Sequence, residues 1–217
     1  MKPNIIIAFM LLCMTFFCAC ELFEDDDDNT SISGEQSEMG KVGTTVESTS
    51  VEYFGVKDFH AEVTTLSDGV SSLSGSAVVT NTFLKNLMSN FPEVTIKGDT
   101  VIATGIKGKN TKEGIELISG PTHGIIVKYG SSVGDEYPIG STGTSRKVVS
   151  KSSTDDYPYG FMYIKVIQVE EIPSALKSAG ISKITYWANH RFGLVGVDFT
   201  FDDQTTADFP IYTSAEN

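Results

Sequence analysis

The chain has 217 residues, of which 40% are hydrophobic and 20% charged, and its formal net charge is −12. This composition is that of a globular protein, long enough for one large domain or two small ones. The excess of acidic residues argues against a general nucleic-acid-binding protein, which needs a basic surface to meet phosphates. The three cysteines, Cys13, Cys18 and Cys20, all lie in the first twenty residues, so no disulfide framework is expected downstream.

The N-terminus has the features of a secretion signal. Lys2 precedes an apolar run from Ile5 to Phe17, which is too short to span a bilayer as a mature helix. The sequence Phe17-Cys18-Ala19-Cys20 resembles a bacterial lipobox. That resemblance implies that residues 1–19 are removed and that Cys20 carries a lipid anchor. The alternative is an ordinary signal peptide with incidental cysteines.

An acidic run that includes Asp25, Asp26, Asp27 and Asp28 follows Cys20 almost directly. Its position resembles the surface-export signal of Bacteroidetes-type lipoproteins. This resemblance implies an outer-membrane lipoprotein that is exposed at the cell surface and meets the membrane through its anchor. A solvated acidic linker is the alternative.

Residues 20–49 are expected to form a flexible tether, because their Ser, Thr, Gly and Glu composition buries too little apolar surface to offset the cost of ordering. Residues 21–50 hold nine acidic residues and one lysine, a net charge of −8, whereas residues 51–217 hold nineteen acidic and fourteen basic residues, a net of −5. The domain expected over residues 50–217 is therefore only mildly acidic.

Short strand-like runs separated by Gly, Asp and Asn predict a mainly β fold for this domain. The expected strands are Val51–Phe59, Val94–Ile96, Thr100–Thr104, Gly114–Ile118, Gly124–Tyr129, Arg146–Ser150, Phe161–Val169, Lys183–Asn189, Leu194–Phe201 and Thr206–Tyr212. Two short helices are expected, one from Thr82 to Phe91 and one from Pro173 to Gly180. We therefore expect an antiparallel sandwich or open barrel with two helices. The alternative is an α+β fold with two helix-plus-sheet halves.

The last three expected strands carry apolar residues at every second position, and matching these apolar faces fixes their pairing parity. A tight hairpin between the first two places Tyr186 opposite Val197 and Trp187 opposite Gly196. The next hairpin brings Pro210 or Tyr212 beside Gly196. The face with Ile184, Tyr186, Ala188, Val195, Val197, Phe199, Phe201, Ala207, Phe209 and Ile211 is expected to be core.

The opposite, polar face carries a large ring, Trp187, which needs an explanation. One explanation is structural, because the ring covers Gly196 or lies beneath the helix from Pro173. The other is a binding platform for a sugar or peptide, made of Trp187 and Tyr212 with polar neighbours. The candidate binding surface comprises Trp187, Tyr212, Arg191, Asn189, Asp198 and Lys183. Tyr157-Pro158-Tyr159 is a second aromatic segment that either stacks on a ligand or covers an end of the fold.

No recognisable catalytic or metal-binding constellation occurs in the sequence. The three histidines, His60, His123 and His190, are not spaced as ligands on one element, and no G-x-S-x-G nucleophile motif is present. We therefore expect no cofactor, no metal and no nucleic-acid partner. The expected function is a non-catalytic binding module for a glycan, a host protein or an envelope component. A secreted hydrolase acting on an extracellular polymer is the alternative.

Overall fold

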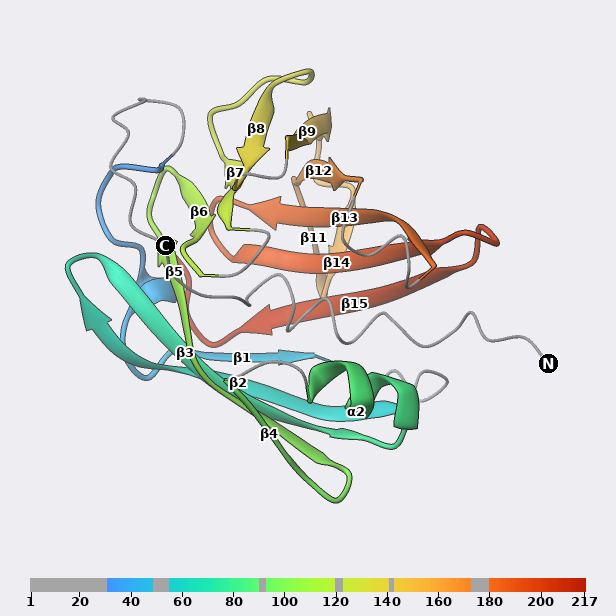
Figure 1. The fold of residues 1–217 in the computed structure, drawn as a ribbon. Helices are drawn as coiled ribbons and strands as arrows, with labels where there is room; N and C mark the ends of the chain where they lie inside the picture. The colour runs from blue at the N-terminus through green and yellow to red at the C-terminus, as the bar shows by residue number, and fades with distance from the viewer. Residues whose placement is uncertain (1–30, 49–54, 90–92, 120–122, 141–142, 173–179) are drawn as a thin grey trace.

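The fold is a mainly antiparallel β-structure that curls into a nearly closed barrel (Figure 1). The computed structural model describes residues 31–48, 55–89, 93–119, 123–140, 143–172 and 180–217. The first half contains a 3-10 helix, η1 (Glu38–Gly40), a short helix, α2 (Thr82–Met88), and the strands β1 (Thr45–Ser48), β2 (Val56–Ser67), β3 (Val70–Val79), β4 (Val94–Lys97), β5 (Thr100–Asn110), β6 (Gly114–Leu117) and β7 (Gly124–Lys128). The second half contains β8 (Glu136–Ile139), β9 (Thr144–Lys151), β10 (Tyr157–Tyr159), β11 (Met162–Ile164), β12 (Ile167–Glu171), β13 (Ile181–Asn189), β14 (Gly193–Phe201) and β15 (Thr206–Thr213).

One continuous sheet runs through both halves of the chain. Its strand order is β7-β6-β5-β3-β2-β1-β15-β14-β13-β12-β9-β8, with β4 as an additional partner of β5, while β10 and β11 form a separate hairpin. Strand β1 joins the halves, since Val46 lies opposite Ala61 of β2 on one side and Thr213 of β15 on the other. The mainly β prediction is therefore confirmed, and the sheet is closer to a barrel than to two separate layers.

Side-chain and backbone hydrogen bonds connect the two terminal strands of this sheet, β7 and β8. The Gly140 backbone N–H donates to the His123 carbonyl (3.0 Å), and the Lys128 N–H donates to the Tyr137 hydroxyl (3.3 Å). From β9, the buried Arg146 guanidinium donates to the Ile125 carbonyl (3.0 Å). These bonds link β7 and the residue before it to β8 and β9, so they limit the exposure of an open sheet edge.

Residues 31–48 belong to the folded domain, which differs from the flexible tether expected over residues 20–49. Ile32 and Met39 are buried, and β1 is an interior strand of the sheet. The Ile32 N–H donates to the Glu116 carboxylate (3.0 Å), which lies inside the fold. Composition alone predicts disorder, because the apolar residues of this segment are widely separated. Ile32 and Met39 are nevertheless buried against apolar side chains of the barrel.

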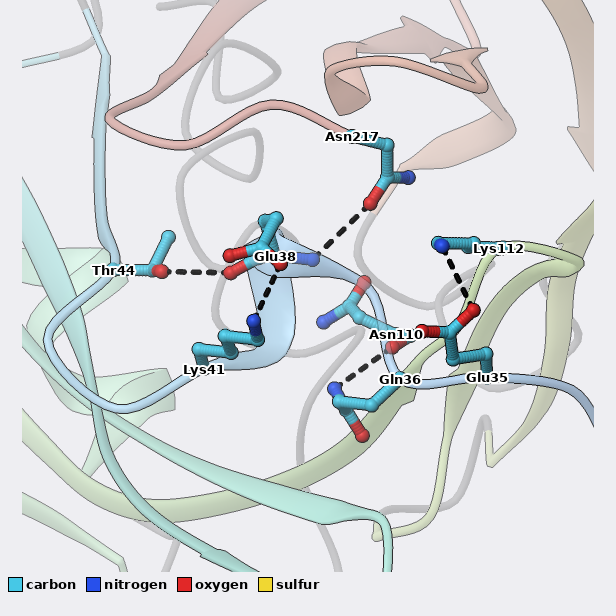
Figure 2. A network of polar contacts seen from close by, with 8 residues as sticks. All are labelled: Glu35, Gln36, Glu38, Lys41, Thr44, Asn110, Lys112 and Asn217. Atoms are coloured by element: carbon cyan, nitrogen blue, oxygen red, sulfur yellow. Dashed lines mark hydrogen bonds and ion pairs between the residues drawn. The ribbon is translucent and has the colours of Figure 1, made fainter.

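Polar contacts tie the same segment to distant parts of the chain (Figure 2). Lys112 pairs with Glu35 (2.8 Å), and the Gln36 side-chain amide donates to the Asn110 carbonyl (2.8 Å). The Glu38 backbone N–H donates to the side chain of Asn217, 179 residues further along the chain (3.1 Å). The folded domain therefore includes the segment from Ser31 onward and joins it to residues around 110 and to Asn217.

The pairing predicted for the last three strands is confirmed. Tyr186 lies opposite Val197, Trp187 opposite Gly196, and Gly196 opposite Pro210. Every residue assigned to the core face is buried. Val195 is buried too, but on the opposite face of the sheet from the one predicted, because the pairing shifts between Trp187 and Ala188.

This β-bulge reverses the faces at the start of β14. Val195 packs in a second apolar cluster, with Tyr159, Ile164, Val166 and Phe192, whereas Leu194 packs against the main core. A period-two reading cannot detect a bulge, because one extra residue exchanges the inward and outward positions beyond it.

The main core contains a polar network between β9, β12 and β13. The Arg146 guanidinium donates to Glu171 (2.9 Å) and the Tyr186 hydroxyl donates to the same carboxylate oxygen (2.9 Å), with both partners of the ion pair buried. Burial raises the pKa of the Tyr186 hydroxyl well above its usual value. Because each charged group has a partner, the network meets the condition under which a buried charge is tolerated.

The segment expected to be helical from Thr82 contains α2, whose Met88 is buried. The helix expected from Pro173 falls on residues 173–179, which lie outside the described residues.

Strand β3 was not predicted, since its sequence is rich in serine and lacks a clear alternation of apolar residues. Among the residues described, no helix has the length and apolar character needed to cross a membrane.

Candidate functional site

The β10–β11 hairpin covers the outer face of β13–β15, opposite the barrel core. Tyr157, Trp187 and Tyr212 pack against the second apolar cluster. The Tyr157 hydroxyl occupies the space beside Gly196, where a Cβ atom would overlap it. Gly196 therefore allows this close approach of a tyrosine from a distant hairpin, and a Cβ atom at this position would displace the Tyr157 hydroxyl.

A groove remains between this hairpin and the strands beneath it. Its volume is about 380 Å³. Its walls combine aromatic rings, prolines and two carboxylates. The lining residues are Tyr157, Pro158, Gly160, Trp187, Asp198, Asp208, Pro210 and Tyr212. Three of the six residues proposed from the sequence, Trp187, Tyr212 and Asp198, thus meet in one groove.

The aromatic side of the groove is built from interlocking rings. The Tyr157 and Trp187 centroids are 5.2 Å apart with 31° between the ring planes. The Tyr159 ring, which does not line the groove, packs against two other rings. Its centroid lies 5.3 Å from that of Tyr212 and 4.8 Å from that of Phe192. These contacts fix the rings in place, and Trp187 remains partly exposed. The ring therefore supports the hairpin and also contributes to the groove wall, so the two explanations for Trp187 are compatible.

The acidic side of the groove is a pair of aspartates on neighbouring strands. Asp198 of β14 lies directly opposite Asp208 of β15. The Trp187 indole N–H donates to the Asp198 carboxylate. Burial raises the pKa of Asp198 to about 6; the negative charge of Asp208 adds to this increase, whereas the indole hydrogen bond and Lys183 oppose it. Like charges directly opposite each other destabilise a sheet, so this pair calls for a functional explanation.

The remaining three predicted residues have other roles. Lys183 pairs with Glu170 (2.7 Å). The Asn189 side chain donates to the Lys165 carbonyl (2.7 Å) and accepts from the backbone N–H groups of Arg191 and Phe192, so it stabilises the β13–β14 turn.

Arg191 lies at the β13–β14 turn rather than in the groove. Its guanidinium pairs with Glu216 (2.9 Å) and lies over the Phe192 ring, 5.1 Å from its centroid. Alternation placed Lys183, Asn189 and Arg191 on the polar side. Lys183 lies toward the start of β13, and Asn189 and Arg191 lie at its turn into β14, so none of the three lines the groove.

Asp208, Pro210 and the Tyr157-Pro158 segment line the groove but are absent from the surface predicted from the sequence. Asp208 and Pro210 could have been found, because alternation along β15 places them on the same outer face as Tyr212. The Tyr157-Pro158 segment carries no local signal for its partner, since nearly thirty residues separate it from Trp187.

No group of three or more His, Cys, Asp or Glu side chains placed to hold a metal ion occurs in the part of the chain that the structure describes. The groove instead offers rings for stacking and carboxylate oxygens that accept hydrogen bonds. In comparisons with known proteins, no family model, curated protein or solved structure matches this chain.

Proposed function

We propose that this protein is a lipid-anchored cell-surface binding module that holds a saccharide in the groove between the β10–β11 hairpin and strands β13–β15. The observation that carries the proposal is the pairing, in one groove of about 380 Å³, of fixed aromatic rings with two carboxylates. A sugar presents C–H groups on its ring faces and hydroxyl donors at its edges. Aromatic rings complement the faces, and carboxylates accept hydrogen bonds from the hydroxyls.

The charge of the groove narrows the choice of saccharide. Asp198 and Asp208 line it, and Lys183, the cation that acts on Asp198, pairs with Glu170. These carboxylates would repel a negatively charged ligand, whereas they would not repel a neutral or amine-bearing ligand. We therefore expect neutral or amino sugars to bind and uronic acids or sulfated sugars to bind weakly or not at all.

The test is a glycan-array screen followed by calorimetric titration of the best ligand. Trp187→Ala should abolish binding, whereas Trp187→Phe, which retains a ring, should preserve part of it. Asp208→Asn should weaken binding, and the matched control Asp202→Asn, in the β14–β15 turn and outside the groove, should not. The melting temperature of each variant separates lost binding from lost folding. Equal binding by wild type and a folded Trp187→Ala variant would refute the groove as the site.

The hydrolase alternative draws on the raised pKa of Asp198, because a general acid needs a carboxyl group that stays protonated near neutral pH. Glycosidases place their two carboxyl groups on either side of the scissile bond. Asp198 and Asp208 instead extend side by side from the same sheet face, and Asp198 already binds the Trp187 indole. This arrangement favours binding. Prolonged incubation with the best glycan should leave its length unchanged, and release of reducing ends would support the hydrolase instead.

The membrane anchor is a separate part of the proposal and rests on the lipobox-like sequence that ends at Cys20. In a bacterial host, palmitate should label the wild-type protein, and Cys20→Ala should be unlabelled and released from membranes. A mature lipoprotein carries several acyl chains, so its attachment should be stable. Labelling that persists in Cys20→Ala would contradict the anchor assignment, and surface proteolysis of intact cells would test exposure.

A further inference from the structure

A second cavity lies inside the barrel, on the other side of the sheet from the groove. It has a volume of about 100 Å³ and is bounded by strands from the first half of the chain together with β14 and β15. Small side chains leave the space open, notably Ala61 of β2, Ala77 of β3 and Ala103 of β5. Because protein interiors are normally filled to crystal-like density, a cavity of this size is a feature that calls for an explanation.

The cavity wall is almost entirely carbon. Among the described residues that line it, Glu116 is the one ionisable side chain, and its carboxylate is already bound by the Ser31 hydroxyl (2.8 Å) and the Ile32 N–H (3.0 Å). A polar ligand would lose its hydrogen bonds to water without replacement there. An occupant must therefore present hydrocarbon to these walls.

The size of the cavity limits the occupant further. An apolar cavity of roughly 150 Å³ stays dry and binds benzene or xenon. A space of about 100 Å³ thus holds a short length of hydrocarbon chain, not a whole lipid. Four lining side chains, Val46, Phe59, Leu73 and Leu194, are only partly buried, so the cavity wall reaches the protein surface. The polar end of an amphiphile would lie at that surface, in water.

Met39 of η1 adds a wall that can adapt to an occupant. Its side chain lines the cavity, and its methyl group packs beside Gly193, where a Cβ atom would lie 3.3 Å away. Methionine adapts readily to different neighbours because its side chain is unbranched and polarisable. The segment that carries Met39 is held by peripheral polar contacts with Lys112, Asn110 and Asn217 (Figure 2).

We infer that the barrel interior is a binding site for the hydrocarbon tail of a single-chain amphiphile, with Met39, Ala61 and Ala103 in contact with the tail. This site is separate from the saccharide groove, because the two cavities share no lining residue in the part of the chain that the structure describes. Each methylene group removed from water strengthens binding roughly fourfold, so affinity should rise with chain length until the cavity is full and then level off.

The test uses the full chain with Cys20→Ala, so that no acyl chain of the protein itself competes. Sodium butyrate, hexanoate, octanoate and decanoate are titrated while the methyl groups of Met and Ala are followed by NMR. The methyl signals of Met39, Ala61 and Ala103 should shift together, and the signal of Met162, which is half exposed and outside the cavity, should not. Shifts of Met162 alone, equal shifts of all methionines, or no shift with any carboxylate would overturn the inference.

Two variants that fill the cavity provide an independent check. Ala103→Leu should remove binding of octanoate, and the smaller change Ala61→Val should weaken it at least several-fold. Both should leave the melting temperature unchanged or higher, since they occupy empty space. If Ala103→Leu does not fold, Ala61→Val and the wild-type methyl shifts still decide the question. Octanoate binding that is as tight in a folded filled variant as in wild type would refute the site.

Discussion

Replacing Asp198 with asparagine is expected to stabilise the domain at neutral pH while it weakens ligand binding. The Asp198 carboxylate is half-buried, lies opposite Asp208, and accepts a hydrogen bond from the Trp187 indole. An asparagine side-chain oxygen can accept the same bond. The substitution therefore removes the buried charge and its repulsion with Asp208 while the contact with Trp187 is preserved.

The magnitude follows from the pKa. In the folded protein the pKa of Asp198 rises from 3.8 to about 6, and each unit of pKa corresponds to about 1.4 kcal/mol. The folded state therefore holds a proton that the unfolded state releases between about pH 4 and pH 6, so this group lowers stability as pH rises through that interval. Above about pH 6 the full decrease in unfolding free energy has occurred. It amounts to about 1–3 kcal/mol, and the lower value allows for the partial solvent exposure of Asp198.

The assay is urea unfolding at pH 4, 5, 6, 7 and 8, followed by the fluorescence of Trp187, the single tryptophan of the chain. The quantity to compare is the difference in unfolding free energy between Asp198→Asn and wild type, because contributions from other carboxylates cancel in it. This difference should grow from about pH 4 to pH 6 and then remain constant. A difference that does not change with pH, or an asparagine variant less stable than wild type at pH 7, would refute the reasoning. Asp202→Asn is the control and should show neither effect.

Three further substitutions test the core, the buried ion pair and the hairpin. Phe199→Ala should lower the unfolding free energy by about 3–5 kcal/mol, since the ring is fully buried in the core; a negligible change in urea unfolding would contradict its assignment. Arg146→Met should cost about 3–5 kcal/mol because it leaves Glu171 buried without its cation. The double variant with Glu171→Leu should recover only part of that loss, because the buried Tyr186 hydroxyl and Ile125 carbonyl then lose these partners. Gly196→Ala should displace Tyr157, which is expected to reduce glycan affinity at nearly unchanged far-ultraviolet circular dichroism; unaltered affinity would show that Tyr157 is not part of the site.

The C-terminal strands show how much of the fold the sequence by itself determines. Alternation of apolar and polar residues along β13, β14 and β15 predicted which residues are buried, and the short turns fixed their pairing, including Trp187 opposite Gly196. Both signals are local, since the side-chain period of a strand is two and a hairpin constrains its own register. The same alternation is sufficient to place Trp187, Asp198 and Tyr212 on one outer face of the sheet.

The groove itself depends on contacts between distant segments. Tyr157 reaches Gly196 only because the β10–β11 hairpin folds back over the sheet, and the local sequence around Tyr157 is the same whether that hairpin covers the sheet or extends into solvent. Cross-strand register alone places Asp198 opposite Asp208. The burial of the Asp198 carboxyl group, which raises its pKa, depends on the hairpin that packs over the sheet.

Tertiary structure also decided the role of residues 31–48 and the closure of the barrel. The apolar side chains of Ile32 and Met39 are isolated in a polar sequence, and they become ordered only because the barrel offers them a surface that the sequence does not reveal. The contacts that connect β7 to β8 through Tyr137 and to β9 through Arg146 likewise need the folded sheet, because these three strands come together only when the barrel forms. Local patterns determine which face of a strand is buried, whereas the partners that cover it are selected by the free energy of the whole packed chain.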